Sequence, residues 1–155
     1  MSHMNRGWIS LAAACTLVIG VYAYTAHLSD TELLFPNAAD ASYNLLAQGF
    51  RAGRLSLKKE VPPGFAQLAD PYDPIANAPY RSAPYFLNDL SYYKGRLYVY
   101  FGVTPALLLF WPVAALTGHY LFPQQAALIF CAVGFLVSVG LLRALWRRYA
   151  ASSNW

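Results

Sequence analysis

The sequence has 155 residues, of which 57% are apolar and only 12% are charged, and its formal net charge is +4. Soluble domains are about one-quarter charged, so this composition argues against a soluble globule. The small positive charge is not gathered into a stripe, which argues against nucleic acid as a partner. Three segments are apolar enough to cross a bilayer, which takes about 20 helical residues. We therefore predict an all-α membrane protein with three transmembrane helices and one extramembrane insert, residues 28–98.

The first predicted span is residues 8–27. The tail before it, residues 1–7, opens with MSHM, which looks like a cloning remnant or an unstructured start. The apolar stretch is too long for the core of a signal peptide, and no small-x-small cleavage site follows, so we expect an uncleaved anchor. Its small residues would let a neighbouring helix approach closely.

The insert begins with a predicted amphipathic helix over residues 40–53. Apolar residues recur there at i, i+3, i+4 and i+7, which is one helical face. They are Tyr43, Leu46, Ala47 and Phe50. Asp40 or Ser42 is expected to cap the helix, and Gly53 to end it. A helix of this size beside a span is expected to lie in the plane of the membrane interface.

A basic cluster follows this helix. Its members are Arg51, Arg54, Lys58 and Lys59. Two interpretations are open: contact with anionic lipid headgroups, or a phosphate clamp on a lipid-linked donor.

Six prolines punctuate residues 62–84, so regular helix is excluded and an ordered series of turns is expected. Asp70 and Asp73 lie three residues apart in this segment. Two carboxylates can contribute to a Ca²⁺ or Mg²⁺ site, but Asp-Pro pairs are also ordinary turn starters. Without further ligands we favour turns and predict no metal site.

Two short runs rich in tyrosine, valine and leucine, Leu90–Tyr93 and Arg96–Phe101, flank Lys94-Gly95. A two-residue loop with glycine predicts a tight β-hairpin. The hairpin contributes a set of four tyrosines that we expect at headgroup depth, as an aromatic belt. They are Tyr92, Tyr93, Tyr98 and Tyr100. The alternative is that some of these rings line a site for a lipid-linked substrate.

The second predicted span, residues 99–117, carries Pro105 and Pro112 and is expected to be kinked. The third is residues 124–146, followed by a tail, 147–155. Three spans place Arg6 and the arginine-rich end of the third span on opposite faces, against the positive-inside bias. An alternative leaves residues 104–116 re-entrant, so that only two helices cross.

Acid–base chemistry is confined to the insert. All seven Asp and Glu residues lie there, and none lies in a predicted span, which argues against a proton relay through the membrane. A carboxylate at a membrane surface can act as general base on a hydroxyl group. Cys15 and Cys131 lie in predicted spans without a metal-ligand neighbour, so we expect small apolar core residues and no disulfide. We expect no cofactor.

The order of elements, with AQGFRAGRLSL, DPYDPIANAPYR and DLSYYKGRLYVYFG followed by a proline-bearing apolar run, resembles the N-terminal part of bacterial glycosyltransferases of the C-type fold. The resemblance implies sugar transfer from a polyprenyl-phosphate donor by a catalytic carboxylate in the first external loop. It matches Asp40 to that position, with Asp30 and Glu32 as rivals. It also implies the bacterial inner membrane, with the insert in the periplasm.

Family members are several times longer and have many more spans. We therefore expect a non-catalytic accessory or structural subunit that packs on other integral membrane subunits, with lipids as further partners. The alternative is an N-terminal fragment of the glycosyltransferase itself, with the polyprenyl-phosphate sugar as its donor.

Overall fold

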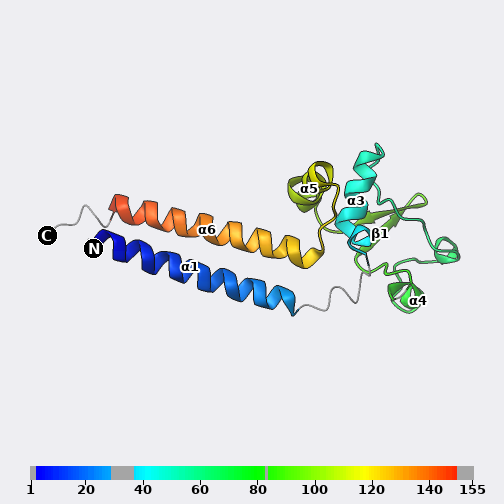
Figure 1. The fold of residues 1–155 in the computed structure, drawn as a ribbon. Helices are drawn as coiled ribbons and strands as arrows, with labels where there is room; N and C mark the ends of the chain where they lie inside the picture. Colours follow the sequence, from blue (N-terminus) through cyan, green and yellow to red (C-terminus); the bar gives the residue numbers. More distant parts are fainter. Residues whose placement is uncertain (1–2, 29–36, 83, 150–155) are drawn as a thin grey trace. The chain divides into compact units, whose positions relative to one another are not determined.

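The computed structural model describes residues 3–28, 37–82 and 84–149, and the chain divides into two compact units (Figure 1). The first unit is the helix pair, formed by α1 (His3–His27) and α6 (Pro123–Tyr149). The second, residues 30–123, contains most of the predicted insert and also the predicted second span, and it holds the shorter helices and a two-stranded sheet. From here on, "insert" means this unit.

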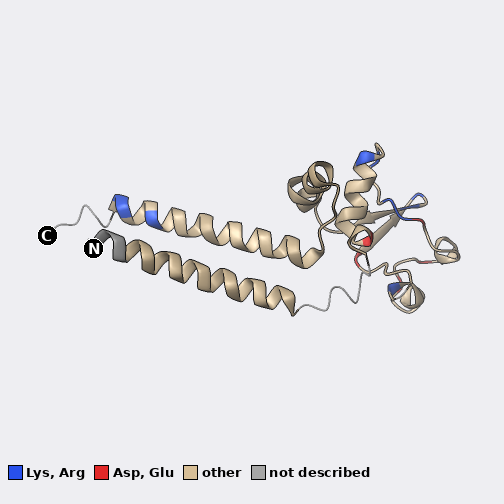
Figure 2. Ribbon diagram, viewed as in Figure 1, with Lys and Arg blue, Asp and Glu red and all other residues tan. Residues whose placement is uncertain are grey.

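The helix pair is antiparallel. Near the start of α1, the guanidinium of Arg143 lies 3.3 Å over the ring of Trp8. Towards the other end, the rings of Tyr22 and Phe135 meet edge to face at 6.3 Å. The arginines of α6 gather at its C-terminal end, where Figure 2 shows blue on an otherwise tan helix. That end lies beside the start of α1.

Both helices of the pair are long and apolar enough to cross a membrane, and within the described ranges they are the two that meet this test. Their 25 and 27 residues rise about 37 and 40 Å at 1.5 Å per residue, more than the roughly 30 Å of a hydrocarbon core. These two helices favour a membrane protein. The expected three spans are not confirmed.

The predicted second span is interrupted and short. A π-helical turn, η3 (Ala106–Phe110), continues into α5 (Trp111–Thr117), and together they rise about 18 Å. Pro105 lies in the first turn of this helical segment, which begins at Thr104, so its missing N–H does not kink the helix. Pro112 has no N–H to give, and just before it Trp111 N–H donates to the carbonyl of Ala106, five residues back.

This short helix has one covered face and one open face. Ala106, Phe110 and Ala114 are buried, and η3 and α5 contact α3. The opposite side exposes large apolar residues. They are Leu107, Leu108, Trp111 and Leu116. The part of the insert with an open apolar helical face is therefore η3–α5.

The amphipathic helix forms as α3 (Ser42–Arg51). No side chain caps it: Ala41 is the N-cap, and Asp40 ends a separate 3-10 helix, η1 (Ala38–Asp40), so the predicted caps are wrong. Gly53 has φ of 69°, as expected for the residue that ends a helix. The face expected to meet lipid is covered by protein, because α3 contacts both η3 and strand β2.

The chain after α3 returns directly against it, and Gly49 makes this possible. A Cβ on Gly49 would fall on the carbonyl oxygen of Ser56. The close approach lets Arg54 N–H donate to Gly49 O and Lys58 N–H donate to Leu45 O, both at 3.0 Å. The motif AQGFRAGRLSL, residues 47–57, thus forms the end of α3 and the chain that runs back along it.

The predicted β-hairpin is confirmed, with β1 (Leu90–Tyr93) antiparallel to β2 (Arg96–Val99). Lys94 and Gly95 both have positive φ, which is the signature of a type I′ turn. Both outer edges are bonded. Leu57 N–H donates to Leu97 O on one side. On the other, the hydroxyl of Tyr72 donates to Tyr92 O at 2.9 Å and accepts from Tyr92 N–H at 3.0 Å.

The core of the insert lies between α3, the hairpin and η3. It gathers Leu45, Leu46, Leu57, Phe65, Leu87, Leu97 and Ala106. Phe65, from the short 3-10 helix η2 (Phe65–Gln67), meets Tyr80, from α4 (Ala78–Arg81), and Tyr92 edge to face. Asn44, fully buried, donates to Ala38 O and Leu121 O at 2.7 Å each.

Candidate functional site

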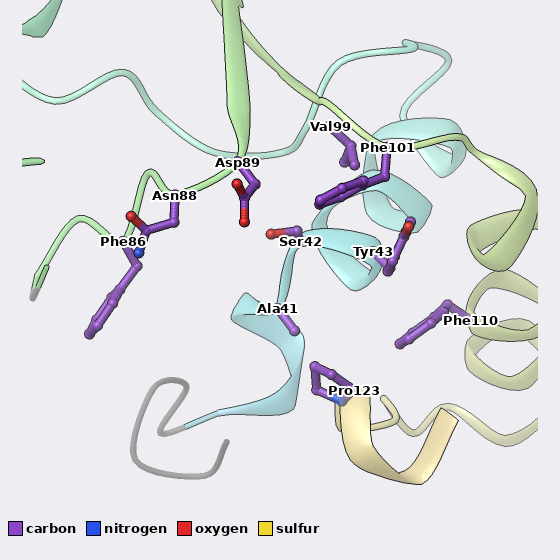
Figure 3. Close-up of a pocket in the computed structure, with 10 residues that line it drawn as sticks. All are labelled: Ala41, Ser42, Tyr43, Phe86, Asn88, Asp89, Val99, Phe101, Phe110 and Pro123. Atoms are coloured by element: carbon purple, nitrogen blue, oxygen red, sulfur yellow. The ribbon is translucent and has the colours of Figure 1, made fainter. Parts of the chain in front are cut away.

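A cavity of about 490 Å³ opens in the insert (Figure 3). It lies within the range of about 300–1,000 Å³ that is usual for small-molecule sites. Five segments supply its walls: the start of α3, the chain before β1, the chain at the end of β2, η3, and Pro123 at the end of the insert. The lining residues are Ala41, Ser42, Tyr43, Phe86, Asn88, Asp89, Val99, Phe101, Phe110 and Pro123.

Two of the polar side chains that line this cavity converge. Figure 3 shows the carboxylate of Asp89 and the hydroxyl of Ser42 pointing toward each other, from the chain before β1 and from α3. The remaining walls are mostly aromatic and aliphatic, and Tyr43 stacks on Phe110 with ring centroids 5.3 Å apart. An apolar cavity with a carboxylate and a hydroxyl at one point suits a ligand with a hydroxylated head and an apolar part.

Two lining residues hold an uncommon backbone conformation. Phe86 has φ of 47° and Asp89 has φ of 56°. A positive φ costs a non-glycine residue on the order of 1–2 kcal/mol, and such conformations concentrate at functional sites. The backbone carbonyl of Asp89 accepts from Tyr100 N–H at 3.2 Å, which fixes the residue at the base of the hairpin.

Burial raises the pKa of the Tyr43 phenol above its usual value. The neutral phenol is therefore retained to higher pH than in water, and its hydroxyl can donate a hydrogen bond to a ligand.

Asp40, the residue matched to the catalytic acid, is exposed and does not line the cavity. Its neighbours Ala41 and Ser42 do, so its Cα is about 4 Å from that of a lining residue. Burial lowers the pKa of the Lys59 ammonium, and the negative charge of Asp40 partly offsets this. Asp30 and Glu32 lie outside the described residues.

The predicted basic cluster divides between different places. Arg51 and Lys58 line a second pocket with Gln48, Ala52 and Tyr120. The ammonium of Lys59 interacts with the negative charge of Asp40. The Nε atom of Arg54 is buried without a hydrogen-bond partner among the described residues.

The carboxylate of Asp70 accepts a hydrogen bond from Tyr72 N–H, and that of Asp73 accepts one from Ile75 N–H, both at 2.8 Å. This is the Asx-turn pattern that the Asp-Pro pairs predict. In the described part of the chain, no group of three or more His, Cys, Asp or Glu residues has metal-binding geometry.

The four tyrosines of the expected belt differ in exposure. Tyr93 and Tyr100 are exposed, whereas Tyr92 and Tyr98 are half-buried, and Tyr92 meets Phe65 in the core. None of the four lines the cavity.

Sequence reasoning included Asp89 only as one of the insert's candidate acid–base carboxylates, and it did not select Ser42 or Asn88 as site residues. The available signal was an Asn-Asp pair directly before a strand, since these two residue types tolerate positive φ. The other wall comes from residues about 45 positions earlier, and only the fold brings them together.

Comparison with family models, curated proteins and solved structures gives no match for this chain.

Proposed function

We propose that the insert is the membrane-surface substrate site of a glycosyltransferase that takes its sugar from a polyprenyl-phosphate donor. The observation that carries the proposal is the cavity, in which the carboxylate of Asp89 and the hydroxyl of Ser42 point toward each other beside aromatic walls. A structural subunit has no need of such a cavity. The resemblance of the sequence motifs to C-type glycosyltransferases points to the same chemistry.

The insert is tethered at both ends by apolar helices, so the proposed site works at a membrane surface. A polyprenyl-phosphate sugar has an apolar tail and a hydroxylated head, which matches the division of the cavity lining into apolar walls and one polar corner. We place the insert on the periplasmic side of a bacterial inner membrane. The arginines at the end of α6 and Arg6 then lie in the cytoplasm, in line with the positive-inside bias.

In this proposal a carboxylate acts as general base. It takes the proton of the acceptor hydroxyl as the hydroxyl oxygen attacks the anomeric carbon of the donor. The bond from that carbon to the phosphate oxygen breaks, and polyprenyl phosphate leaves with the electron pair. Asp89 is the carboxylate that lines the cavity, and Asp40, beside its rim, is the alternative base.

The test compares three charge-neutralising variants of nearly unchanged shape: Asp89→Asn, Asp40→Asn and, as control, the exposed Glu60→Gln. Membranes containing the protein are supplied with a radiolabelled polyprenyl-phosphate sugar, and loss of label from the donor is measured. We expect Asp89→Asn to lower the rate by about 10²-fold or more, and Glu60→Gln to leave it unchanged. A rate unaffected by both Asp89→Asn and Asp40→Asn contradicts the proposal.

A second function, that of a non-catalytic accessory subunit, is favoured by separate observations. The open apolar face of η3–α5 and the free space around Gly20, Gly134 and Gly140 would suit packing against other membrane helices.

Purification from the native membrane in mild detergent, followed by mass spectrometry, distinguishes the two functions. A stoichiometric set of other membrane subunits, together with full function of Asp89→Asn, favours the accessory subunit. Co-purified polyprenyl-phosphate lipid that is lost in Asp89→Asn favours the transferase.

A further inference from the structure

A second, polar pocket of about 360 Å³ lies at the C-terminal end of α3. Its lining residues are Gln48, Arg51, Ala52, Lys58 and Tyr120. They come from the last turns of α3, the returning chain and the segment just before α6. None of them lines the larger cavity, so this pocket is a separate feature of the insert.

The two cations of this pocket are fixed at their backbones and free at their charged ends. Arg51 lies in the last turn of α3, where the end of the helix is blue in Figure 2. Lys58 N–H is bonded to Leu45 O, which holds the lysine beside the same helix. In the described parts of the chain neither side chain forms an ion pair, and no carboxylate lines the pocket.

The donors present match a phosphate group. An arginine fork, a lysine ammonium and a tyrosine hydroxyl can all donate to phosphate oxygens, and bonds between charged partners are the strongest of this kind. Gln48 donates one of its two amide N–H groups to Ala39 O, so the anion would be held mainly by Arg51, Lys58 and Tyr120.

The position of Tyr120 in the chain indicates where such a phosphate comes from. It precedes the first residue of the apolar helix α6, Pro123, by three residues, so the two Cα atoms are within about 10 Å. Tyrosine and basic residues this close to the start of a span are typical of the headgroup layer, where phosphodiesters are the common anion.

We propose that this pocket binds a phosphate group, supplied by the headgroup of an anionic phospholipid. The proposal does not depend on the glycosyltransferase function, because it uses different residues and a different ligand. It assigns Arg51 and Lys58 a specific lipid contact, whereas Lys59 and Arg54 lie outside the site.

The experiment uses the whole chain in a neutral detergent and the soluble short-chain lipid dihexanoyl-phosphatidylglycerol, with dihexanoyl-phosphatidylcholine and inorganic phosphate as comparison probes. Affinities are measured by native mass spectrometry and by isothermal titration. The test variant is Arg51→Gln with Lys58→Gln. The matched control is Lys94→Gln with Arg96→Gln, which removes the same charge from the exposed hairpin turn. Tyr120→Phe removes only the hydroxyl.

We expect phosphatidylglycerol to bind more tightly than phosphatidylcholine. The Arg51/Lys58 double variant should weaken its binding at least tenfold, Tyr120→Phe several-fold, and the control double variant less than twofold. Near-ultraviolet circular dichroism confirms that each variant is folded. Equal losses in both double variants would mean unspecific attraction and overturn the site. Binding of inorganic phosphate without binding of phosphatidylglycerol would overturn the lipid assignment.

Discussion

The helix pair and the insert differ in how far they bury their leucines. In the helix pair large apolar side chains face outward: Leu17 is 72% exposed and Leu142 is 66% exposed. In the insert Leu46 and Leu97 are 2% and 1% exposed, inside a core of their own. Hydroxyls in the helix pair bond back to their own helices, as Thr16 does to Ala12 O and Ser138 to Gly134 O. The insert therefore builds a core of its own, whereas the helix pair leaves its large apolar side chains uncovered.

The difference indicates which features of the sequence determine the structure of each unit. The helix pair needs an apolar surface and satisfied backbone groups, so many substitutions of similar character should be tolerated. The insert depends on single contacts, such as the approach at Gly49 and the hydroxyl of Tyr72. Three experiments test this contrast.

The largest effect is expected in membrane topology. In a chain without Cys15 and Cys131, single cysteines replace Ala66 in the insert and Arg147 at the end of α6, both exposed. With α1 and α6 as the crossing helices, the two sites lie on opposite sides of the membrane. An impermeant maleimide added to sealed, oriented vesicles should label one site and reach the other only after permeabilisation.

If Ala106–Thr117 crossed the membrane as a third helix, the two cysteines would lie on the same side and react together. That outcome would remove η3–α5 from the insert and break the division into two units. Labelling of both cysteines in permeabilised vesicles is the control for accessibility.

The next effect is the loss of stability in Gly49→Ala. In an ordinary helix this change is favourable by up to about 1 kcal/mol. Here the added methyl group meets the carbonyl of Ser56, and we expect the insert to lose about 3 kcal/mol. The thermal midpoint of the near-ultraviolet circular dichroism signal, which reports the aromatic core, measures the loss.

Gly102→Ala and Gly134→Ala are the matched controls, since an added Cβ meets nothing within 4 Å at either position. Gly102 lies in the insert and Gly134 in α6. Both variants should stay within about 0.5 kcal/mol of the unchanged protein. A loss in Gly134→Ala as large as that in Gly49→Ala would show that the helix pair also depends on close single contacts.

The smallest effect is expected for Tyr72→Phe. The change removes a hydroxyl that bonds both backbone groups of Tyr92, and we expect a loss of about 1–2 kcal/mol. Tyr100→Phe, at a tyrosine that is 74% exposed, should cost less than about 0.5 kcal/mol. Equal midpoints for the two variants would mean that the edge of β1 is held by packing alone.

Local signals in the sequence were sufficient for the elements of both units. Periodicity predicted α3, a glycine loop predicted the hairpin, and apolar length predicted α1 and α6. A span over residues 99–117 is not confirmed. The segment carries no charged residue, and composition does not distinguish a helix that packs on α3 from one that crosses a bilayer. In the structure β2 ends at Val99, and the apolar helix that follows is the shorter segment Ala106–Thr117.

The candidate site was less predictable, because its parts are distant in sequence. Asp40 could be singled out by resemblance, but Asp89 becomes a site residue only when the chain before β1 meets the start of α3. Likewise, four basic residues within nine positions suggested one cluster. In the structure the chain turns back beside Gly49, so Arg51 and Lys58 line one pocket, whereas Lys59 interacts with the charge of Asp40.

The two hydrogen bonds of Asn44 have a consequence for how this protein could have been assembled. They join Ala38, near the start of the insert, to Leu121, near its end, through one buried side chain. These bonds hold the two ends of the insert close together. The flanking helices therefore do not have to offset the entropic cost of closing that loop. Domains whose two ends lie close together can be inserted into other proteins. The insert is thus suited to transplantation into the turn of an unrelated helical hairpin.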